Sequence, residues 1–424
     1  MQFFERKIVL LYRLYLKYIS MFQRAKKYFF ILFINLLLLP AAFSQVSIQN
    51  QENSKFFSQG ESYFKDKNYI AAKNEFNQYL TKNSELDLGF EAQVVRSEYY
   101  INLSNLYLNQ SDAEISAQRF IKKYSFLPES RELMRKIGLY FYDKANFEKA
   151  IQYLEFSADN HTEATYKLAM SYYELKDFEK ALVFFESIVD AEQEEYSFNA
   201  AYYAGVLNFK DGNFDLAIKD FKKAEGNSKY REEIPNWIGL SYFNQNKYQE
   251  LIKYAEPIVS NPSSIYKIDE LVLLLAQVEY KLNQFEAASK NFEKAFNLVP
   301  KSKTPETSFQ YGYSLFKLNQ YSRSIEELEE LAIQKDSLAQ LAAYTMALAN
   351  LEANRKNESL EAFGISKELN FNPSIQEESK FNYAKLLFDL NRIEDCLINL
   401  GNFNKVYSNS EYLLESYNIA RNAI

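Results

Sequence analysis

The feature that most constrains this chain is a spaced set of side chains that recurs ten times. In the clearest copies a small residue is followed by an aromatic residue nine positions later, a compact residue at twelve and a bulky residue at sixteen, as in Gly205, Phe214, Ala217 and Phe221. Successive copies lie 31 to 37 residues apart, except for one spacing of 44. Self-similarity at such a period predicts an array in which each unit packs mainly against its neighbours. The small anchor residues are Gly60, Ser104, Gly138, Ala169, Gly205, Gly239, Ala276, Gly312, Ala347 and Ala384.

Each half of the repeated unit has the apolar spacing of a helix. Apolar residues recur at intervals of three and four within both halves, which predicts a pair of helices, A and B, joined by a turn. A glycine or alanine anchor on helix A and a compact residue twelve positions later let the two helices approach closely, and the bulky residue at sixteen is expected to fill the next gap. Gly239 is therefore expected at a contact between helices A and B. The sequence predicts an all-α chain, a solenoid of about ten helix-turn-helix repeats.

These residues resemble the tetratricopeptide repeat, a family with a period of 34 residues and a Gly or Ala at its eighth position. The match covers about residues 50–410, and Pro300 falls where the family often has proline near the end of a repeat. The family's Trp at position 4 is missing throughout, and Leu251 replaces the small residue at position 20 in one repeat. The resemblance implies a right-handed α-solenoid that binds protein or peptide partners in a concave groove.

In this family the groove is lined by positions 2, 5, 9, 12 and 13 of helix A. Positions 5 and 12 are mostly aromatic here and position 2 is repeatedly acidic, so the resemblance implies an aromatic floor and a neutral or basic partner. The alternative is that these rings pack against the adjacent helix A. Seven aromatic residues are the candidate groove: Tyr166, Tyr173, Tyr202, Phe209, Phe243, Phe309 and Phe316.

The N-terminal segment has the three parts of a secretory signal peptide. Basic residues precede an apolar run at 28–39, and small residues follow it, so we expect residues 21–44 to be removed between Ser44 and Gln45. The run is too short to span a bilayer as a helix. Residues 1–20 have two interpretations: a gene start extended upstream of Met21, or a basic amphipathic segment that lies on a membrane.

The chain also resembles exported tetratricopeptide proteins of Bacteroidetes-type bacteria, which have aromatic, Asn- and Lys-rich repeats behind a signal ending in Ser-Gln. This resemblance implies a periplasmic location or a peripheral association with the outer membrane. Arrays of such proteins usually run on further. The stretch 410–420 has the spacing of an eleventh helix A with Tyr412, Leu413, Tyr417 and Ala420 on one side, so we expect the region 45–424 to stop within a repeat. Two interpretations follow: the chain is a fragment of a longer array, or a partner, such as a second copy of the chain, covers the apolar edge.

The composition argues against most chemistry. One His (His161) and one Cys (Cys396) cannot form a His/Cys metal cluster, a Cys-His nucleophile pair or a disulfide, and no glycine spacing fits a phosphate-binding loop or a nucleophile elbow. We expect His161 in a loop and Cys396 packed at a compact position. The chain has 49 basic and 56 acidic residues, and without the seven basic and one acidic residue of 1–44 its net charge is −13, which disfavours nucleic acid.

The sequence therefore predicts a scaffold that is not an enzyme, with no cofactor, no metal and no integral membrane span after processing. Two other functions stay open. One is a structural subunit of an outer-membrane assembly or secretion machine, and the other is a carbohydrate-binding protein that stacks sugars on the groove aromatics.

Overall fold

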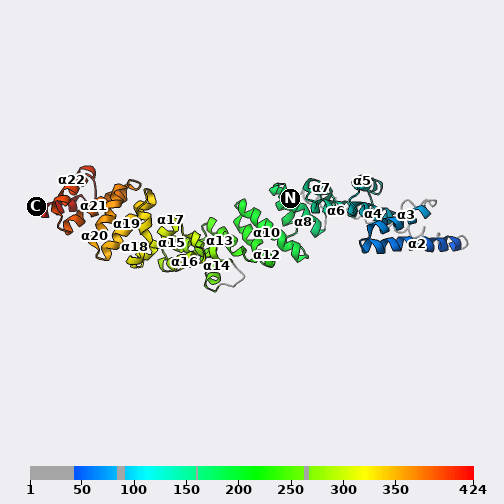
Figure 1. Cartoon of the computed structure of the whole chain (residues 1–424), viewed down its shortest axis with the longest axis horizontal. Coiled ribbons are helices and arrows are strands. Elements are labelled where there is room, and N and C mark those ends of the chain that lie inside the picture. The colour runs from blue at the N-terminus through cyan, green and yellow to red at the C-terminus, as the bar shows by residue number, and fades with distance from the viewer. Residues whose placement is uncertain (1–42, 84–90, 159–160, 262–266) are drawn as a thin grey trace, which may run out of the picture. The chain divides into compact units, whose positions relative to one another are not determined.

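The computed structural model describes residues 43–83, 91–158, 161–261 and 267–424, and every regular element in these ranges is helical (Figure 1). The predicted signal peptide lies outside the described residues as far as residue 42, and the Ser44–Gln45 bond lies in the first turn of α2. The chain divides into two compact units, Met1–Leu175 and Lys176–Ile424, which are described separately.

In both units, helices that follow one another in the chain pack against one another in space. The first unit contains α2 (Phe43–Lys65), α3 (Tyr69–Lys82), α4 (Ala92–Tyr107), α5 (Ala113–Lys123), α6 (Pro128–Asp143), α7 (Phe147–Leu154) and α8 (Thr162–Glu174). The second contains α9 (Phe178–Glu186), α10 (Glu194–Lys210), α11 (Phe214–Ala224), α12 (Ser228–Arg231), α13 (Ile234–Asn244), α14 (Tyr248–Ser260), α15 (Asp269–Lys281), α16 (Phe285–Leu298), the 3₁₀ turn η1 (Pro300–Ser302), α17 (Pro305–Lys317), α18 (Tyr321–Ala332), α19 (Ser337–Glu352), α20 (Lys356–Glu368), α21 (Pro373–Asp389), α22 (Ile393–Val406) and α23 (Leu413–Asn422). The prediction of an all-α array of helix pairs is confirmed.

The anchor glycines allow a bulky side chain to lie directly on the backbone of helix A. A Cβ added to Gly205 would come within 2.9 Å of the Phe221 ring, and one added to Gly138 within 2.6 Å of Leu154. Gly60 and Gly312 meet Phe76 and Leu328 in the same way. The bulky residue at sixteen therefore covers its own anchor, and the expectation that it fills the next gap was wrong.

Gly239 is the exception among the anchors. Its added Cβ would lie 2.7 Å from Leu271 Cδ1, on the next helix A, α15, whereas Ala255 occupies the bulky position of its own repeat. The expectation that Gly239 lies at its own A/B contact was therefore wrong. Alanine is too short to reach the glycine, so the side chain that covers it comes from the following repeat.

The turn between helices A and B is built in the same way in repeat after repeat. A residue with positive φ ends helix A, and the next amide donates back to a carbonyl five residues earlier, as from Lys247 to Tyr242 at 3.0 Å. This is the Schellman arrangement, which favours glycine or asparagine at the left-handed residue. The left-handed residues are Lys67, Asn109, Ala145, Lys176, Gly212, Asn246, Asn283, Asn319, Asn354 and Asn391.

This turn corrects the register of the second repeat. In the other nine repeats the left-handed residue follows the anchor by seven positions, which makes Asn102 rather than Ser104 the equivalent of the anchor before Asn109. Ser116 Oγ, on helix B, donates to Asn102 Oδ1 at 2.7 Å. The turn contains two extra residues before α5 begins at Ala113. Because of these two residues, Ser104 lies at the usual distances from the residues of helix B. The sequence pattern therefore indicated Ser104 as the anchor and did not reveal the insertion.

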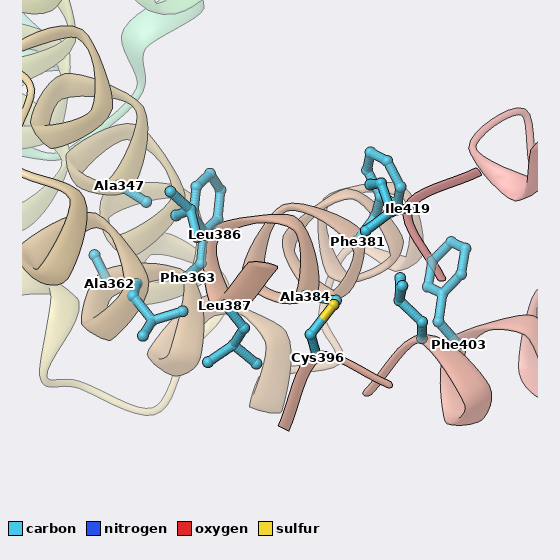
Figure 2. Close-up of a cluster of buried hydrophobic side chains, with 12 residues drawn as sticks. Ala347, Ala362, Phe363, Phe381, Ala384, Leu386, Leu387, Cys396, Phe403 and Ile419 are labelled. Carbon is cyan, nitrogen blue, oxygen red and sulfur yellow. The ribbon is translucent and has the colours of Figure 1, made fainter. Parts of the chain in front are cut away.

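The predictions for the two scarce side chains are confirmed. Cys396 is a fully buried free thiol beside Ala384 in the C-terminal core (Figure 2), and burial raises its pKa. His161 precedes α8 and caps it, since His161 Nδ1 accepts from the Ala164 amide at 3.3 Å. Partial burial and the nearby Arg135 lower the pKa of His161.

The last helix, α23, packs on α21 and α22. It buries Ser416 and Ile419, and the Tyr412 ring stacks on Phe381 at 4.7 Å between centroids. The expected apolar side of this helix was only partly right, because Tyr417 is 55% exposed. Self-association through this edge stays a prediction.

Candidate functional site

The first unit contains a cleft of about 750 Å³ along three successive first helices, α2, α4 and α6. Because these helices are the A helices of consecutive repeats, the cleft lies on the surface that the family resemblance identifies as the binding groove. Its lining residues are Glu61, Phe64, Lys65, Arg96, Tyr99, Tyr100, Leu103, Tyr107, Pro128, Glu129, Glu132 and Lys136.

The corrected register explains why α4 contributes so much to this cleft. With Asn102 as the eighth position of its repeat, Arg96, Tyr99, Leu103 and Tyr107 take positions 2, 5, 9 and 13. These are positions that the resemblance assigns to the groove. The sequence analysis missed them because it placed the anchor two residues too late. The asparagine that ends helix A could have revealed the error.

The aromatic floor of the cleft is held in place by ring contacts. The Phe64 ring lies 4.8 Å from Tyr100 and 6.2 Å from Tyr107, between centroids. Tyr100 also stacks on Phe76 at 5.0 Å, and Tyr107 lies 4.9 Å from Tyr69. Rings fixed in this way lose little conformational entropy when a ligand covers them.

Charged side chains of both signs surround the floor. Arg96 Nη2 lies 2.9 Å from Glu61 Oε1, and its guanidinium lies 5.7 Å from the centroid of the Phe57 ring. Burial and the neighbouring Glu132 carboxylate, to which the Tyr99 hydroxyl donates, raise the pKa of this hydroxyl, so it stays protonated. The cleft has three acidic and three basic side chains. This balance favours a ligand with little net charge.

The seven aromatic residues of the sequence prediction do not line this cleft. Tyr166 is 9% exposed and the other six are half-buried. Tyr202 stacks on Tyr230 at 3.9 Å, and burial together with Glu233 raises the pKa of Tyr202 to about 12. Their role in binding stays a prediction.

Position 12 has a recurring contact of its own. The Phe209 ring lies 5.4 Å from Phe214, and Phe316 lies 6.0 Å from Tyr321. Each pair joins the end of helix A to the first residue of helix B. The rings at this position therefore brace the turn, which limits the area that a partner could reach.

Within the described residues, no group of three or more His, Cys, Asp or Glu side chains is placed to hold a metal ion. A search of the same residues finds no helix with the length and apolarity that a membrane crossing requires.

Two family models match parts of the chain. The tetratricopeptide repeat model matches residues 163–191, and the model described as anaphase-promoting complex, cyclosome, subunit 3 matches residues 244–331. Both matches fall on helix pairs of the array.

Comparisons with individual proteins give weaker likenesses. A tetratricopeptide repeat protein from Parabacteroides merdae is 15% identical over 62% of this chain and 99% of its own, with a TM-score of 0.34. MamA from Desulfovibrio magneticus is 18% identical over 41% of this chain and 97% of its own, with a TM-score of 0.32. Among curated proteins, the type II methyltransferase M.CeqI of Rhodococcus hoagii is 24% identical over 180 residues, 39% of this chain. The aligned part spans only 35% of that enzyme.

The paired helices, the recurring turn and the anchor packing define a repeat scaffold of the class that binds protein partners. With the family matches, they identify the chain as a tetratricopeptide-repeat protein.

Proposed function

We propose that this protein is a non-enzymatic scaffold of the cell envelope that binds a peptide segment of a partner in the cleft of α2, α4 and α6. The observation that carries the proposal is the aromatic floor formed by Phe64 of α2 and by Tyr100 and Tyr107 of α4, in a cleft that three successive A helices line. Concave sites of this volume with fixed rings and a few polar groups are typical of ligand binding. The equal numbers of acidic and basic side chains fit a peptide with little net charge.

The binding test uses peptides selected from a random displayed library on the purified chain. Tyr107→Ala and Arg96→Ala should each weaken the selected peptides about tenfold, because both side chains line the cleft. Lys122→Ala on α5, an exposed residue of the same unit outside the cleft, is the matched control. Equal affinity for all three variants would contradict the cleft as the binding site.

The same variants separate the other functions. A structural subunit would keep its envelope partners when Tyr107 and Arg96 are replaced. A carbohydrate-binding protein would retain specific sugars on a glycan array and select no peptide.

Export is the part of the proposal that rests on the N-terminal sequence. The basic residues before 28–39 and the small residues before Gln45 support cleavage after Ser44. N-terminal sequencing of the protein recovered from the envelope should begin at Gln45. Recovery of a chain that retains residues 28–39 would contradict the periplasmic location.

A further inference from the structure

A second cleft, of about 690 Å³, lies in the other unit among α14, α15 and α16. It is lined by both polar and apolar groups, and a carboxyl group lies deep in it: Glu279 of α15, which is only 3% exposed. The aromatic ring of Phe285 also lines this cleft. The cleft is separate from the proposed peptide site and has a different chemistry.

The Glu279 carboxyl group is held through one oxygen only. Its Oε2 accepts from Asn291 Nδ2 at 2.8 Å, whereas no described residue donates to Oε1. Oε1 is not among the fully buried polar atoms that lack a partner, so it remains accessible from the cleft. A nearly buried side chain thus offers one unpaired acceptor to a space large enough for a ligand.

The other charged groups of the cleft add negative charge at its rim. Glu256 comes from α14 and Glu286 and Lys290 from α16. Lys290 Nζ lies 2.8 Å from Glu286 Oε1, and this ion pair neutralises both groups. Glu256 and Glu279 remain, so the site favours a cation.

An equivalent acid–amide pair occurs in another repeat of the same unit. Asp220 of α11 is 6% exposed and accepts from Asn208 Nδ2 of α10 at 2.9 Å, at the same two repeat positions with acid and amide exchanged. Asp220 does not line this cleft. The acid–amide pair therefore serves as an A/B contact in both repeats, and Glu279 in addition lines the cleft.

We propose that this cleft binds a primary alkylammonium group, the chemistry of a lysine side chain or of a free polyamine, with Glu279 Oε1 as the acceptor. A guanidinium binds a carboxylate most strongly through both oxygens, and here it would have to share Oε2 with Asn291. An ammonium is a point charge that one oxygen satisfies, and its alkyl chain can lie along Val259, Leu275 and Phe285.

The test is titration calorimetry at pH 8 with capped alanine pentapeptides that carry a central lysine, acetyl-lysine or arginine, and with putrescine. The lysine peptide should bind, and the acetyl-lysine and arginine peptides should bind about tenfold more weakly or not at all. Binding of putrescine in place of the peptide would assign the site to free amines, with the same chemistry. Equal binding of the acetyl-lysine peptide, or no binding by either amine, would overturn the proposal.

Variants locate the bound amine. Glu279→Gln should weaken the amine that binds about tenfold while its carbonyl still accepts from Asn291, and Asp220→Asn is the matched control that leaves the affinity unchanged. If Glu279→Gln does not fold, Glu256→Gln, at an exposed residue, should still reduce the affinity about threefold. Unchanged affinity in the variants that fold would place the amine elsewhere and overturn the proposal.

The pH dependence gives an independent readout. Burial and the nearby Glu256 raise the pKa of Glu279 to about 7, and the other charged groups that line the cleft are Glu286 and Lys290. Amine binding needs the carboxylate, so the affinity should fall several-fold from pH 8 to pH 6. A flat profile would contradict the assignment of Glu279 as the acceptor.

Discussion

The repeat of α10 and α11 and the repeat of α13 and α14 follow one another in the chain, but they distribute large and small side chains in opposite ways. In the first, Ala217 is the compact residue of helix B, and Phe221 covers Gly205. In the second, Leu251 occupies the compact position and Ala255 the bulky one, and both are fully buried. The two repeats therefore fill their A/B contacts with exchanged side-chain sizes.

Because the side-chain sizes are exchanged, the anchor glycine of the second repeat is covered by a side chain of the following repeat and not by one of its own. Ala255 cannot reach Gly239, and Leu271 of α15 takes the place that Phe221 has in the previous repeat. Helix α13 is also shorter than α10 and packs less extensively on its helix B. The comparison indicates that the total side-chain volume at an A/B contact is conserved, whereas the size of the residue at each position is not. This is expected for close-packed interiors.

The departing repeat also contributes to the second cleft. Its helix B supplies Glu256, Val259 and Ser260 to the wall that faces Glu279. The repeat that breaks the packing rule thus borders the site that we propose for an alkylammonium group.

Restoring the usual sizes in the second repeat is the strongest test of this comparison. Leu251→Ala should cost about 2–5 kcal/mol of the free energy of unfolding through a cavity, and Ala255→Phe about 1–3 kcal/mol through overpacking. The double variant should cost less than the sum, because the new ring can occupy part of the space that the leucine leaves. Urea unfolding of the three variants measures the coupling, with Ala217→Leu/Phe221→Ala as the mirrored control in the first repeat. Strictly additive losses would show that the two positions do not share one volume.

The two anchor glycines should differ by a smaller amount. At Gly205 a methyl group meets the Phe221 ring at 2.9 Å, and a buried ring cannot move far. At Gly239 the nearest atom is Leu271 Cδ1, the end of a flexible side chain. We expect Gly205→Ala to be about 1 kcal/mol more destabilising than Gly239→Ala, where the higher helix propensity of alanine offsets the crowding. Thermal unfolding of both variants measures this difference, and the opposite order would contradict the assignment of the two contacts.

A further expected difference is a pH dependence of stability that Asp220 gives to the first of these two repeats and that the second lacks. Asp220 pairs with Asn208 there, whereas Tyr242 and Tyr254 occupy the same positions in the second repeat, with ring centroids 6.0 Å apart. Burial raises the pKa of Asp220 from its usual value near 3.8 to about 6. Between these values the folded state binds more protons than the unfolded state, so the stability contributed by Asp220 falls as the pH rises from about 4 to about 6. Asp220→Asn should remove that part of the pH dependence in urea unfolding, and an unchanged profile would show that Asp220 titrates normally.

The fold could be predicted from the sequence because its signals are local and repeated. Anchor, compact and bulky residues lie within one helix pair, and each copy strengthens the others, so Gly205 was placed correctly at an A/B contact, although Phe221 was expected to fill the next gap. The asparagines that end the A helices are an equally local signal, although it was not used. These asparagines indicate Asn102 rather than Ser104 as the anchor of the second repeat. With that register, Tyr99 and Tyr107 fall on groove positions of helix A, and the sequence would have predicted them in the first cleft.

By itself, the sequence determined the helix pairs and most of the small residues at which helices come close, because these depend on residues at most sixteen positions apart, and the recurrence of that pattern gave the period. Only the tertiary structure decided which side chain covers Gly239, because Leu271 lies a whole repeat further along the chain. The same holds for Glu279, whose cleft is assembled from α14, α15 and α16. Whether a side chain is accessible in such a cleft depends on how the side chains of three helices pack together. The periodic pattern within one repeat does not specify this packing.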